Sequence, residues 1–203
     1  VFKGLQSLNE ISLSNNRLES IDYAFEDLNE LTIIYLNSNY LREINNRTFF
    51  GIENQLKVLG LNDNILDQYI DRNVFDKLGK NIDKLYLNQI KTDPSIFINF
   101  SIFSQLTYLD LSQTQLTIKD DRFNNIPKSV SIIYLEKVSQ ISLIYLPMSK
   151  LINLLEFDIS DNLIDWSEFC DHSSNRLFHF HPKLSDVFLR NTSLKNLDCL
   201  NLT

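Results

Sequence analysis

Hydrophobic and polar residues follow one recurring pattern along the whole chain. In residues 31–41, apolar residues occupy positions one, four, six and eleven, and an asparagine occupies position nine. Copies of this pattern begin at Leu8, Leu31, Leu56, Ile82, Leu106, Val130, Leu154 and Leu184. These starts are 23 to 30 residues apart, and the longest interval is the last one. About eight copies in phase predict a row of stacked, similar coils.

The pattern also predicts how each copy folds. Positions four and six have the period of a short strand, so their side chains enter a core shared with neighbouring coils. The asparagine at position nine can donate and accept hydrogen bonds where the chain turns away from the strand. Thr114 and Thr192 can make some of these bonds in their copies. Ile90 and Val138 cannot, so we expect irregular backbone in the fourth and sixth copies.

A second apolar marker follows the first five predicted strands. It consists of phenylalanines about 17–19 residues after the start of each copy, at Phe25, Phe49, Phe75, Phe100 and Phe123. Because they recur once per coil, we expect these rings to form a column in the core under the outer side of the coils.

Composition and charge limit the classes of function. The 203 residues are 43% hydrophobic and 22% charged, which suits a globular or repeat protein with a long core. The net charge of −7 argues against nucleic-acid binding by a basic surface. No run reaches the roughly 18 apolar residues of a membrane span, so we expect membrane contact only through a segment outside this chain. No secretory signal is present, and both termini fall inside coils, so residues 1–203 are expected to be a single domain, a fragment lacking its caps.

These copies resemble the extracellular class of leucine-rich-repeat proteins, whose repeats are about 24 residues long. Toll-like receptors of innate immunity, chaoptin-like adhesion proteins and Slit-type guidance proteins belong to this class. The resemblance rests on the copies given above, including Leu-Ser-Asn-Asn-Arg-Leu at 13–18, and on the trailing phenylalanines. It implies an α/β repeat fold of mostly strand and loop: a right-handed leucine-rich-repeat solenoid with a parallel β-sheet on its concave face. It also implies extracellular recognition of a protein or other ligand, without catalysis.

Positions three, five, seven and eight of each copy are predicted to face solvent on the concave side. In copies two to six, positions three and five supply an apolar and aromatic set with one acid, which we predict to bind a protein ligand or co-receptor: Ile33, Tyr35, Val58, Tyr86, Tyr108, Asp110, Ile132 and Tyr134. The alternative is that these residues only stabilise the sheet as cross-strand neighbours. Glu156, Asp158 and Asp186 add negative charge in the C-terminal half, which favours a basic partner.

Two cysteines, Cys170 and Cys199, lie at nearly equivalent places on adjacent coils. Stacked coils are about 5 Å apart, which suits the Cα separation of a disulfide, so we predict a bridge between them. One alternative is that Cys199 belongs to a C-terminal cap whose other cysteines lie beyond the chain. The other alternative is two free buried thiols.

Four Asn-x-Ser/Thr motifs are candidate glycosylation sites, at Asn46, Asn99, Asn191 and Asn201. About three such motifs are expected by chance at this composition, so their placement matters more than their number. Asn46 and Asn99 fall on the predicted outer side of coils. Asn191 follows a strand, where a glycan would cover one end of the concave face.

Metal and catalytic chemistry have little support in the sequence. Cys170, His172, His179 and His181 contain zinc-binding residue types, but their spacing fits no standard zinc signature. We therefore expect polar residues of an exposed insertion, with no metal and no cofactor. Gly79-Lys80 lacks the rest of a phosphate-binding loop, and no G-x-S-x-G motif is present, so the chain is not predicted to be an enzyme.

Three functions remain open at this point. The leading one is a non-catalytic recognition module of a secreted or cell-surface protein that binds through its concave face. The second is a structural or adhesion protein that self-assembles as a homo-oligomer or mediates cell–cell or matrix contacts. The third is an intracellular scaffold, which would have reduced cysteines and no glycans.

Overall fold

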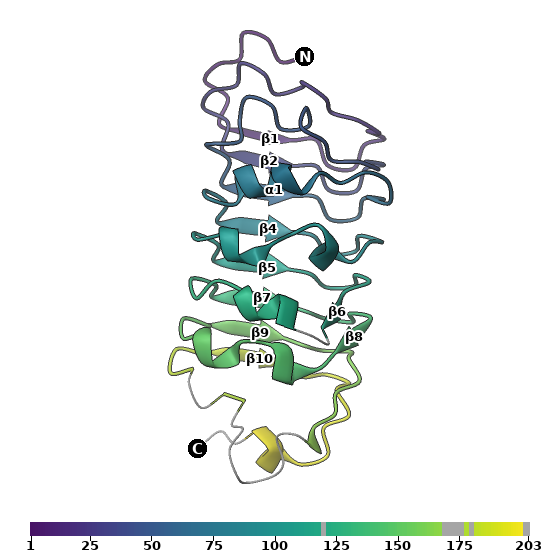
Figure 1. Cartoon of the computed structure of the whole chain (residues 1–203), viewed down its shortest axis with the longest axis vertical. Coiled ribbons are helices and arrows are strands. Elements are labelled where there is room, and N and C mark those ends of the chain that lie inside the picture. The colour runs from purple at the N-terminus through teal and green to yellow at the C-terminus, as the bar shows by residue number, and fades with distance from the viewer. Residues whose placement is uncertain (119–120, 168–176, 179–180, 201–203) are drawn as a thin grey trace.

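The computed structural model describes residues 1–118, 121–167, 177–178 and 181–200, with only the backbone at 121–122 and 198–199. Its main feature is an eight-stranded parallel sheet. The strands, in order across the sheet, are β1 (Glu10–Ser12), β2 (Ile33–Tyr35), β3 (Val58–Gly60), β4 (Lys84–Tyr86), β5 (Tyr108–Asp110), β7 (Ile132–Tyr134), β9 (Glu156–Asp158) and β10 (Asp186–Phe188). Figure 1 shows them stacked in sequence order along the long axis of the molecule.

Every strand of this sheet occupies positions three to five of its sequence copy, and neighbouring strands pair in register. Ile33, for example, pairs with Glu10 on one side and Val58 on the other. Equivalent residues therefore form straight columns across the sheet. We call the solvent-facing side of this sheet, formed by the side chains at positions three and five, the concave face.

The core lies directly behind the sheet. In copies two to seven, the side chains at positions four and six are fully buried. At position four these are Ile34, Leu59, Leu85, Leu109, Ile133 and Phe157, and at position six they are Leu36, Leu61, Leu87, Leu111, Leu135 and Ile159. The predicted phenylalanine column is also buried, with at most 2% exposure for any of its five rings. Phe100 and Phe123 are in direct contact, with ring centroids 5.4 Å apart.

The side opposite the sheet is built from short helices and loops. It carries α1 (Arg72–Leu78), η1 (Pro94–Ile96), η2 (Phe100–Ile102), η3 (Asp121–Asn125), η4 (Leu143–Tyr145), η5 (Met148–Lys150) and η6 (Leu197–Leu200). In Figure 1, α1 and several of these 3₁₀ helices lie in front of the sheet. A second, two-stranded parallel sheet joins two coils through β6 (Thr117–Ile118) and β8 (Gln140–Ile141).

Buried asparagines connect successive coils where each strand ends. Asn64 is 3% exposed; its Oδ1 accepts a hydrogen bond from the Leu41 N–H (3.1 Å). Its Nδ2 donates to the carbonyls of Leu36 and Leu61, both at 2.9 Å. One asparagine thus satisfies backbone groups of two coils, as Asn39 and Asn162 also do.

Threonine replaces only part of this bonding. The Thr114 hydroxyl donates to the Leu111 carbonyl at 2.8 Å and accepts from the Leu116 N–H at 3.3 Å. Both bonds stay within one coil. Among the described residues, the Thr114 hydroxyl makes no bond to the neighbouring coil of the kind that an asparagine makes. The prediction that threonine makes some of these bonds is therefore confirmed at this position.

The expected irregularity of the fourth and sixth copies is not found at the strand-end turn. Position eight has a positive φ between 51° and 60° in every copy, at Asn15, Ser38, Asp63, Gln89, Gln113, Lys137, Asp161 and Asn191. The Gln89 and Lys137 N–H groups donate to carbonyls of the following coil at 2.9 Å, as in other copies. The turn is regular because inter-coil backbone hydrogen bonds hold it, whichever side chain occupies position nine.

Candidate partner-binding face

The concave face carries a continuous row of tyrosine rings. The ring centroids of Tyr86 and Tyr108 are 4.6 Å apart, and those of Tyr108 and Tyr134 are 5.5 Å apart in an edge-to-face arrangement. Tyr35 extends the row to a ring distance of 6.4 Å from Tyr86. All four side chains are partly exposed, so the row offers aromatic surface to a partner. We call these four residues the tyrosine row.

Gly60 allows Tyr35 to join the tyrosine row. Gly60 lies between Tyr35 and Tyr86 in the sheet register. A Cβ atom on Gly60 would lie 2.4 Å from Asn37 Oδ1 and 3.0 Å from Tyr35 Cδ1. The space that a side chain would fill is therefore already occupied by its neighbours. A strand with a glycine at this position permits the aromatic contact to cross it.

Asp110 is surrounded by three members of the tyrosine row. Tyr86 and Tyr134 are its partners in the register on the two neighbouring strands. Tyr108 lies two residues before it on the same strand and therefore on the same face of the sheet. The column that follows position five thus reads Tyr86, Asp110, Tyr134 and then Asp158.

The Asp110 carboxylate lacks a basic partner among the residues that the structure describes. Its Oδ1 accepts a hydrogen bond from the Ser112 N–H at 3.0 Å. Burial raises the pKa of Asp110 above its usual value, and the carboxylates of Glu136 and Asp158 raise this pKa further, while the Ser112 hydrogen bonds oppose the shift. The site therefore holds a partly buried negative charge that nothing in the described chain neutralises.

The phenol groups of Tyr108 and Tyr134 remain uncharged near neutral pH. Burial is the main cause that raises the pKa of both Tyr108 and Tyr134, and nearby carboxylates add to it. The Tyr134 hydroxyl donates a hydrogen bond to Glu156 Oε2, which fixes the ring beside the next strand. The negative charge of the concave face thus comes from its carboxylates, whereas the tyrosines supply flat apolar surface.

One arginine neutralises the neighbouring acidic groups. The Arg190 guanidinium pairs with the Glu136 carboxylate at 2.8 Å and also with Asp161. Hydrogen bonds from Asn191 and Arg190 lower the pKa of Asp161. These two acids therefore have cationic partners from within the chain, in contrast to Asp110.

The structure places the predicted partner-binding residues on one face. Seven of them are partly exposed: Ile33, Tyr35, Tyr86, Tyr108, Asp110, Ile132 and Tyr134. Val58 is the exception, because it is 8% exposed and the expectation of a solvent-facing side chain is not met. Its neighbours in the register, Ile33 and Lys84, have longer side chains.

The predicted set omits an aromatic residue at the C-terminal end of the concave face. Phe188 is 45% exposed and occupies position five of the last copy. It lies at an open hollow of about 470 Å³ lined by Asp158, Ser160, Val187, Phe188, Leu189 and Arg190. Its position in the repeat is a usable signal, since position five supplies three of the four members of the tyrosine row in earlier copies.

The candidate glycosylation sites differ in how their side chains are engaged. Asn46 and Asn99 are exposed and lie outside the strands of the sheet. Asn99 Oδ1 accepts hydrogen bonds from the Ser101 N–H and hydroxyl at 3.2 and 2.8 Å, which caps η2. Asn191 Nδ2, the atom that would carry a glycan, donates to Asp161 at 3.0 Å. Asn201 lies outside the described residues.

The predicted disulfide and most of the histidine cluster also fall outside the described residues, because Cys170, His172, His179 and the Cys199 side chain are not covered. His181 is described and is 6% exposed, so the expectation of an exposed residue is wrong for it. It packs edge-to-face against Phe178, and burial lowers the pKa of its imidazole. Within the described ranges, no group of three or more His, Cys, Asp or Glu side chains could hold a metal.

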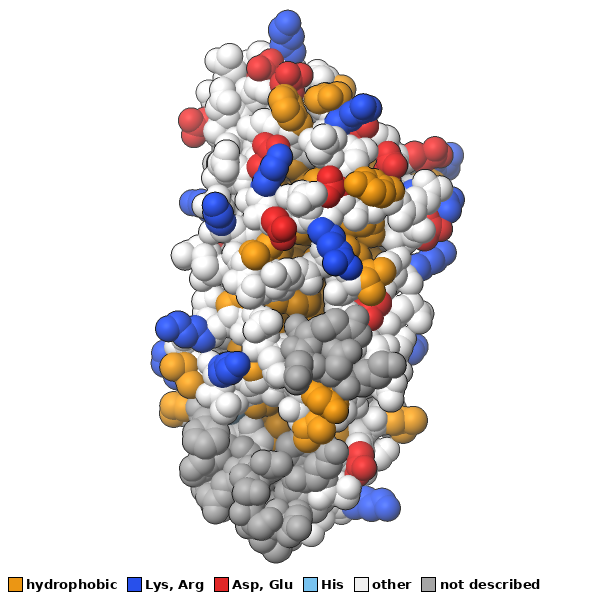
Figure 2. All heavy atoms as spheres, viewed as in Figure 1, with side chains coloured by type: hydrophobic (Ala, Val, Ile, Leu, Met, Phe, Trp, Pro, Cys, Tyr) orange, Lys and Arg blue, Asp and Glu red, His pale blue; other side chains and the backbone are white. Residues whose placement is uncertain are grey.

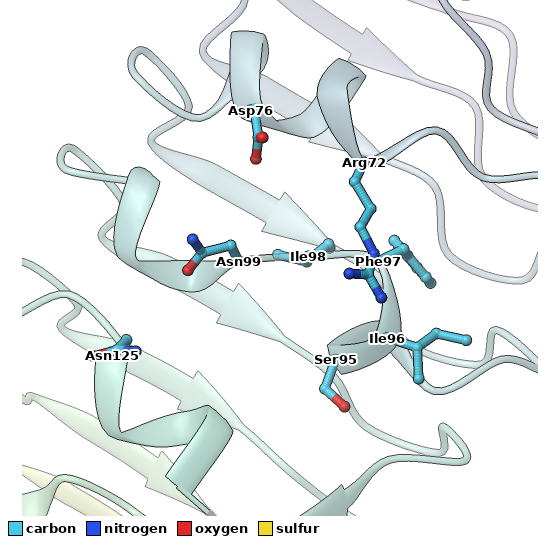
Figure 3. A pocket seen from close by; sticks show the side chains of 8 residues that line it. All are labelled: Arg72, Asp76, Ser95, Ile96, Phe97, Ile98, Asn99 and Asn125. Atoms are coloured by element: carbon cyan, nitrogen blue, oxygen red, sulfur yellow. The ribbon is translucent and has the colours of Figure 1, made fainter.

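A second hollow lies on the helical side of the molecule and is shown in Figure 3. Its volume is about 370 Å³, and it is lined by Arg72, Asp76, Ser95, Ile96, Phe97, Ile98, Asn99 and Asn125. Figure 2, which shows this side of the molecule, has basic, acidic and hydrophobic side chains interspersed over its surface. Because this hollow contains charges of both signs, it favours no single class of ligand.

Comparison with known proteins gives the fold a name. The family model for the leucine-rich repeat matches residues 1–41. This chain has the leucine-rich-repeat fold. The predicted resemblance and fold class are thereby confirmed, since the parallel sheet of stacked coils is the arrangement that the repeat pattern predicted. No curated protein matches the sequence.

Solved leucine-rich-repeat structures have the same architecture at low sequence identity. Internalin C2 of Listeria monocytogenes is 22% identical with a TM-score of 0.68, over 91% of this chain and 72% of that one. Human 5T4, the trophoblast glycoprotein, is 19% identical with a TM-score of 0.70, over 92% and 72%. TLR13, solved in complex with ssRNA13, is 23% identical with a TM-score of 0.66, over 97% of this chain and 32% of that one.

Proposed function

We propose that this chain is a non-catalytic recognition module that binds a protein ligand or co-receptor through its concave face. The observation that carries the proposal is the tyrosine row, which places four partly exposed aromatic rings in contact on one side of the sheet. Tyrosine supplies large contact area at little cost in conformational entropy, and it is frequent among the residues that dominate binding energy.

Aromatic stacking within the sheet does not by itself account for the acids between the rings. A half-buried carboxylate without a basic partner costs stability, because burial disfavours its charged form. A chain under selection for stability alone gains by replacing Asp110 with a neutral residue. A partner that supplies the missing positive charge gives this residue a role that stability does not.

We further propose that the module is secreted or lies on the cell surface. The exposed motifs at Asn46 and Asn99 support this location, because both stand clear of the concave face and leave it free when glycosylated. The predicted Cys170–Cys199 disulfide would also be stable only in an oxidising compartment. Among the described residues, no helix is long and apolar enough to cross a membrane.

A structural or adhesion role is the second candidate, and one observation favours it. Leu163 is 86% exposed and Phe188 is 45% exposed, both near the C-terminal end of the sheet. Apolar side chains so exposed suit a contact with a second copy or with other extracellular material. Sedimentation of the purified chain at increasing concentration distinguishes the two functions: reversible self-association supports adhesion, and a monomer that captures a foreign protein supports recognition.

The leading proposal is tested with a pair of double variants. Tyr86→Ala with Tyr134→Ala removes two rings from the concave face, whereas Tyr40→Ala with Tyr69→Ala removes two rings that are 49% and 59% exposed away from the strands. Each chain is screened against a panel of secreted and cell-surface proteins. We expect partners of the wild type to lose at least about tenfold in affinity for the concave variant, as expected when hot-spot residues are removed, and to keep their affinity for the control.

The concave variant also loses ring contacts worth about 0.5–1.5 kcal/mol each, so its stability is measured in parallel. Binding is then compared at a temperature where both variants are folded. Equal binding by the concave variant and the wild type would contradict the assignment of the concave face as the binding site.

A further inference from the structure

The surroundings of Asp110 restrict what can bind there. Its carboxylate lies between Tyr86 and Tyr134 in the register, with Tyr108 on the same face. Ser112 hydrogen-bonds to this carboxyl group through its N–H, at 3.0 Å from Oδ1, and through its hydroxyl, but no basic residue of the described chain pairs with it. The site is thus a carboxyl group without a cationic partner, with tyrosines on its own strand and on both neighbouring strands. This arrangement suits a ligand with a positive charge and an apolar or planar surface.

Charge complementarity excludes several ligand classes. Asp158 and Glu156 lie on the next strand but one, so the local field is strongly negative and repels nucleic acids and acidic peptides. Lys84 lies beside Tyr108 in the register but makes no ion pair with Asp110 in the described structure. A calcium ion needs six to eight oxygen ligands, whereas the described residues contain no group of acids able to hold a metal.

The chain itself shows which cation satisfies acids next to this face. Three coils beyond β5, Arg190 bridges the carboxylates of Glu136 and Asp161 with its guanidinium. Arginine is planar and weakly hydrated, so it can stack on an aromatic face and donate to a carboxylate at the same time. A lysine ammonium is a compact, strongly hydrated charge and gains less from the rings.

We propose that the concave face recognises an arginine side chain of a partner protein, with its guanidinium donating to Asp110 while it lies against the rings of Tyr86, Tyr108 and Tyr134. This inference deepens the proposed function and rests on it, because it names the chemistry of the partner at the same face. Tyr134 and Asp158 repeat the alternation of ring and acid along the column. A partner segment with a second basic residue therefore finds a second acid there.

The test uses short capped peptides as probes. Acetyl-(Gly-Arg)₄-amide, the matched lysine peptide and the matched glutamate peptide are titrated into the purified chain by calorimetry at about 10 mM salt, where charge screening is weak. We expect the arginine peptide to bind more tightly than the lysine peptide, and the glutamate peptide not to bind. Equal affinity for the arginine and lysine peptides would overturn the role of the rings.

Matched variants locate the binding. Asp110→Asn removes the charge but can still accept the Ser112 N–H; Glu10→Gln removes a concave-face carboxylate from the first strand, away from the tyrosine row. Because Asp110→Asn completes an Asn-x-Ser motif with Ser112, all chains for this experiment are produced in a bacterial host that does not glycosylate it. We expect Asp110→Asn to weaken arginine-peptide binding at least about tenfold and Glu10→Gln less than about twofold.

The remaining outcomes separate this inference from the proposed function. Equal weakening by Asp110→Asn and Glu10→Gln means general attraction to an acidic chain and overturns the arginine site. Should Asp110→Asn unfold, Tyr86→Leu provides the second test, because it removes a ring and keeps the carboxylate; unchanged peptide binding would then contradict the proposal. A peptide that fails to bind, alongside a protein partner lost on Tyr86→Ala with Tyr134→Ala, rejects the arginine site alone. A peptide that binds as expected, with every protein partner unaffected by that double variant, rejects the proposed function.

Discussion

At the scale of single residues, Asp110 links stability to pH. Burial raises the pKa of its carboxyl group above the ordinary value of 3.8, so the folded chain holds this proton more tightly than the unfolded chain. The contribution of Asp110 to the free energy of unfolding is therefore largest at low pH and decreases as the pH rises through the folded-state pKa. At neutral pH, the ionised Asp110 lowers the stability of the fold.

The substitution Asp110→Asn should therefore stabilise the chain at pH 7. It removes the buried charge and retains an oxygen that can accept the Ser112 N–H. We expect the free energy of unfolding in urea to exceed that of the wild type at pH 7, and the difference to disappear at about pH 3, where both chains are neutral at this position. An unaltered or lower stability at pH 7 would contradict a destabilising charge at Asp110.

At the scale of the repeat element, stacking depends on polar contacts between coils as well as on apolar burial. The asparagine at position nine satisfies backbone groups of its own coil and of the one before it. The backbone of each turn also donates to the next coil. Neighbouring coils are thus joined both by their shared core and by hydrogen bonds that recur once per copy.

Removing one inter-coil asparagine should be costly. Asn64→Ala leaves the Leu41 N–H without its partner and two carbonyls with fewer bonds, in a region that excludes water. Since an unpaired buried polar group costs about 1–3 kcal/mol, we expect a loss of about 2–4 kcal/mol in the free energy of unfolding. The measurement is chemical denaturation followed by circular dichroism.

Asn16→Ala is the matched control for that substitution. Asn16 has the same place in the first copy, but it is exposed and its side chain bonds only to carbonyls of its own coil. We expect it to cost less than about 1 kcal/mol, because water can replace its bonds. Equal losses for the two variants would mean that the inter-coil bonds of Asn64 add nothing.

At the scale of the whole molecule, periodicity alone predicts most of the architecture. The repeat period places every strand of the eight-stranded sheet, since each lies at positions three to five of a copy, and it identifies the buried residues at positions four and six. The hydrogen bonds of the asparagine at position nine are also predictable, because the chain leaves the sheet there and its backbone groups need partners.

Other features depend on neighbours that lie far apart in the sequence. The regular turns at Gln89 and Lys137 come from backbone hydrogen bonds to the next coil, which a side-chain pattern does not reveal. The burial of Val58 depends on the lengths of its lateral neighbours, and the reach of Tyr35 depends on the missing side chain of Gly60. The burial of His181 comes from tertiary packing, which the polar residues of its segment do not predict.

The most direct test of the central claim covers the concave face with a glycan. Because Asp110→Asn completes an Asn-x-Ser motif with Ser112, secretion from a eukaryotic host directs a glycan to the centre of this face. Mass spectrometry measures the occupancy, and Asp158→Asn, which completes the same motif with Ser160, is the substitute if occupancy is low.

Peptide N-glycosidase then removes the glycan and leaves an aspartate at position 110, which restores the wild-type sequence. The wild type, passed through the same treatment, controls for the loss of glycans elsewhere. The account predicts that the fully glycosylated variant does not bind the protein partners of the wild type and that binding returns after the enzyme has acted. Undiminished binding by the fully glycosylated variant would contradict recognition through the concave face.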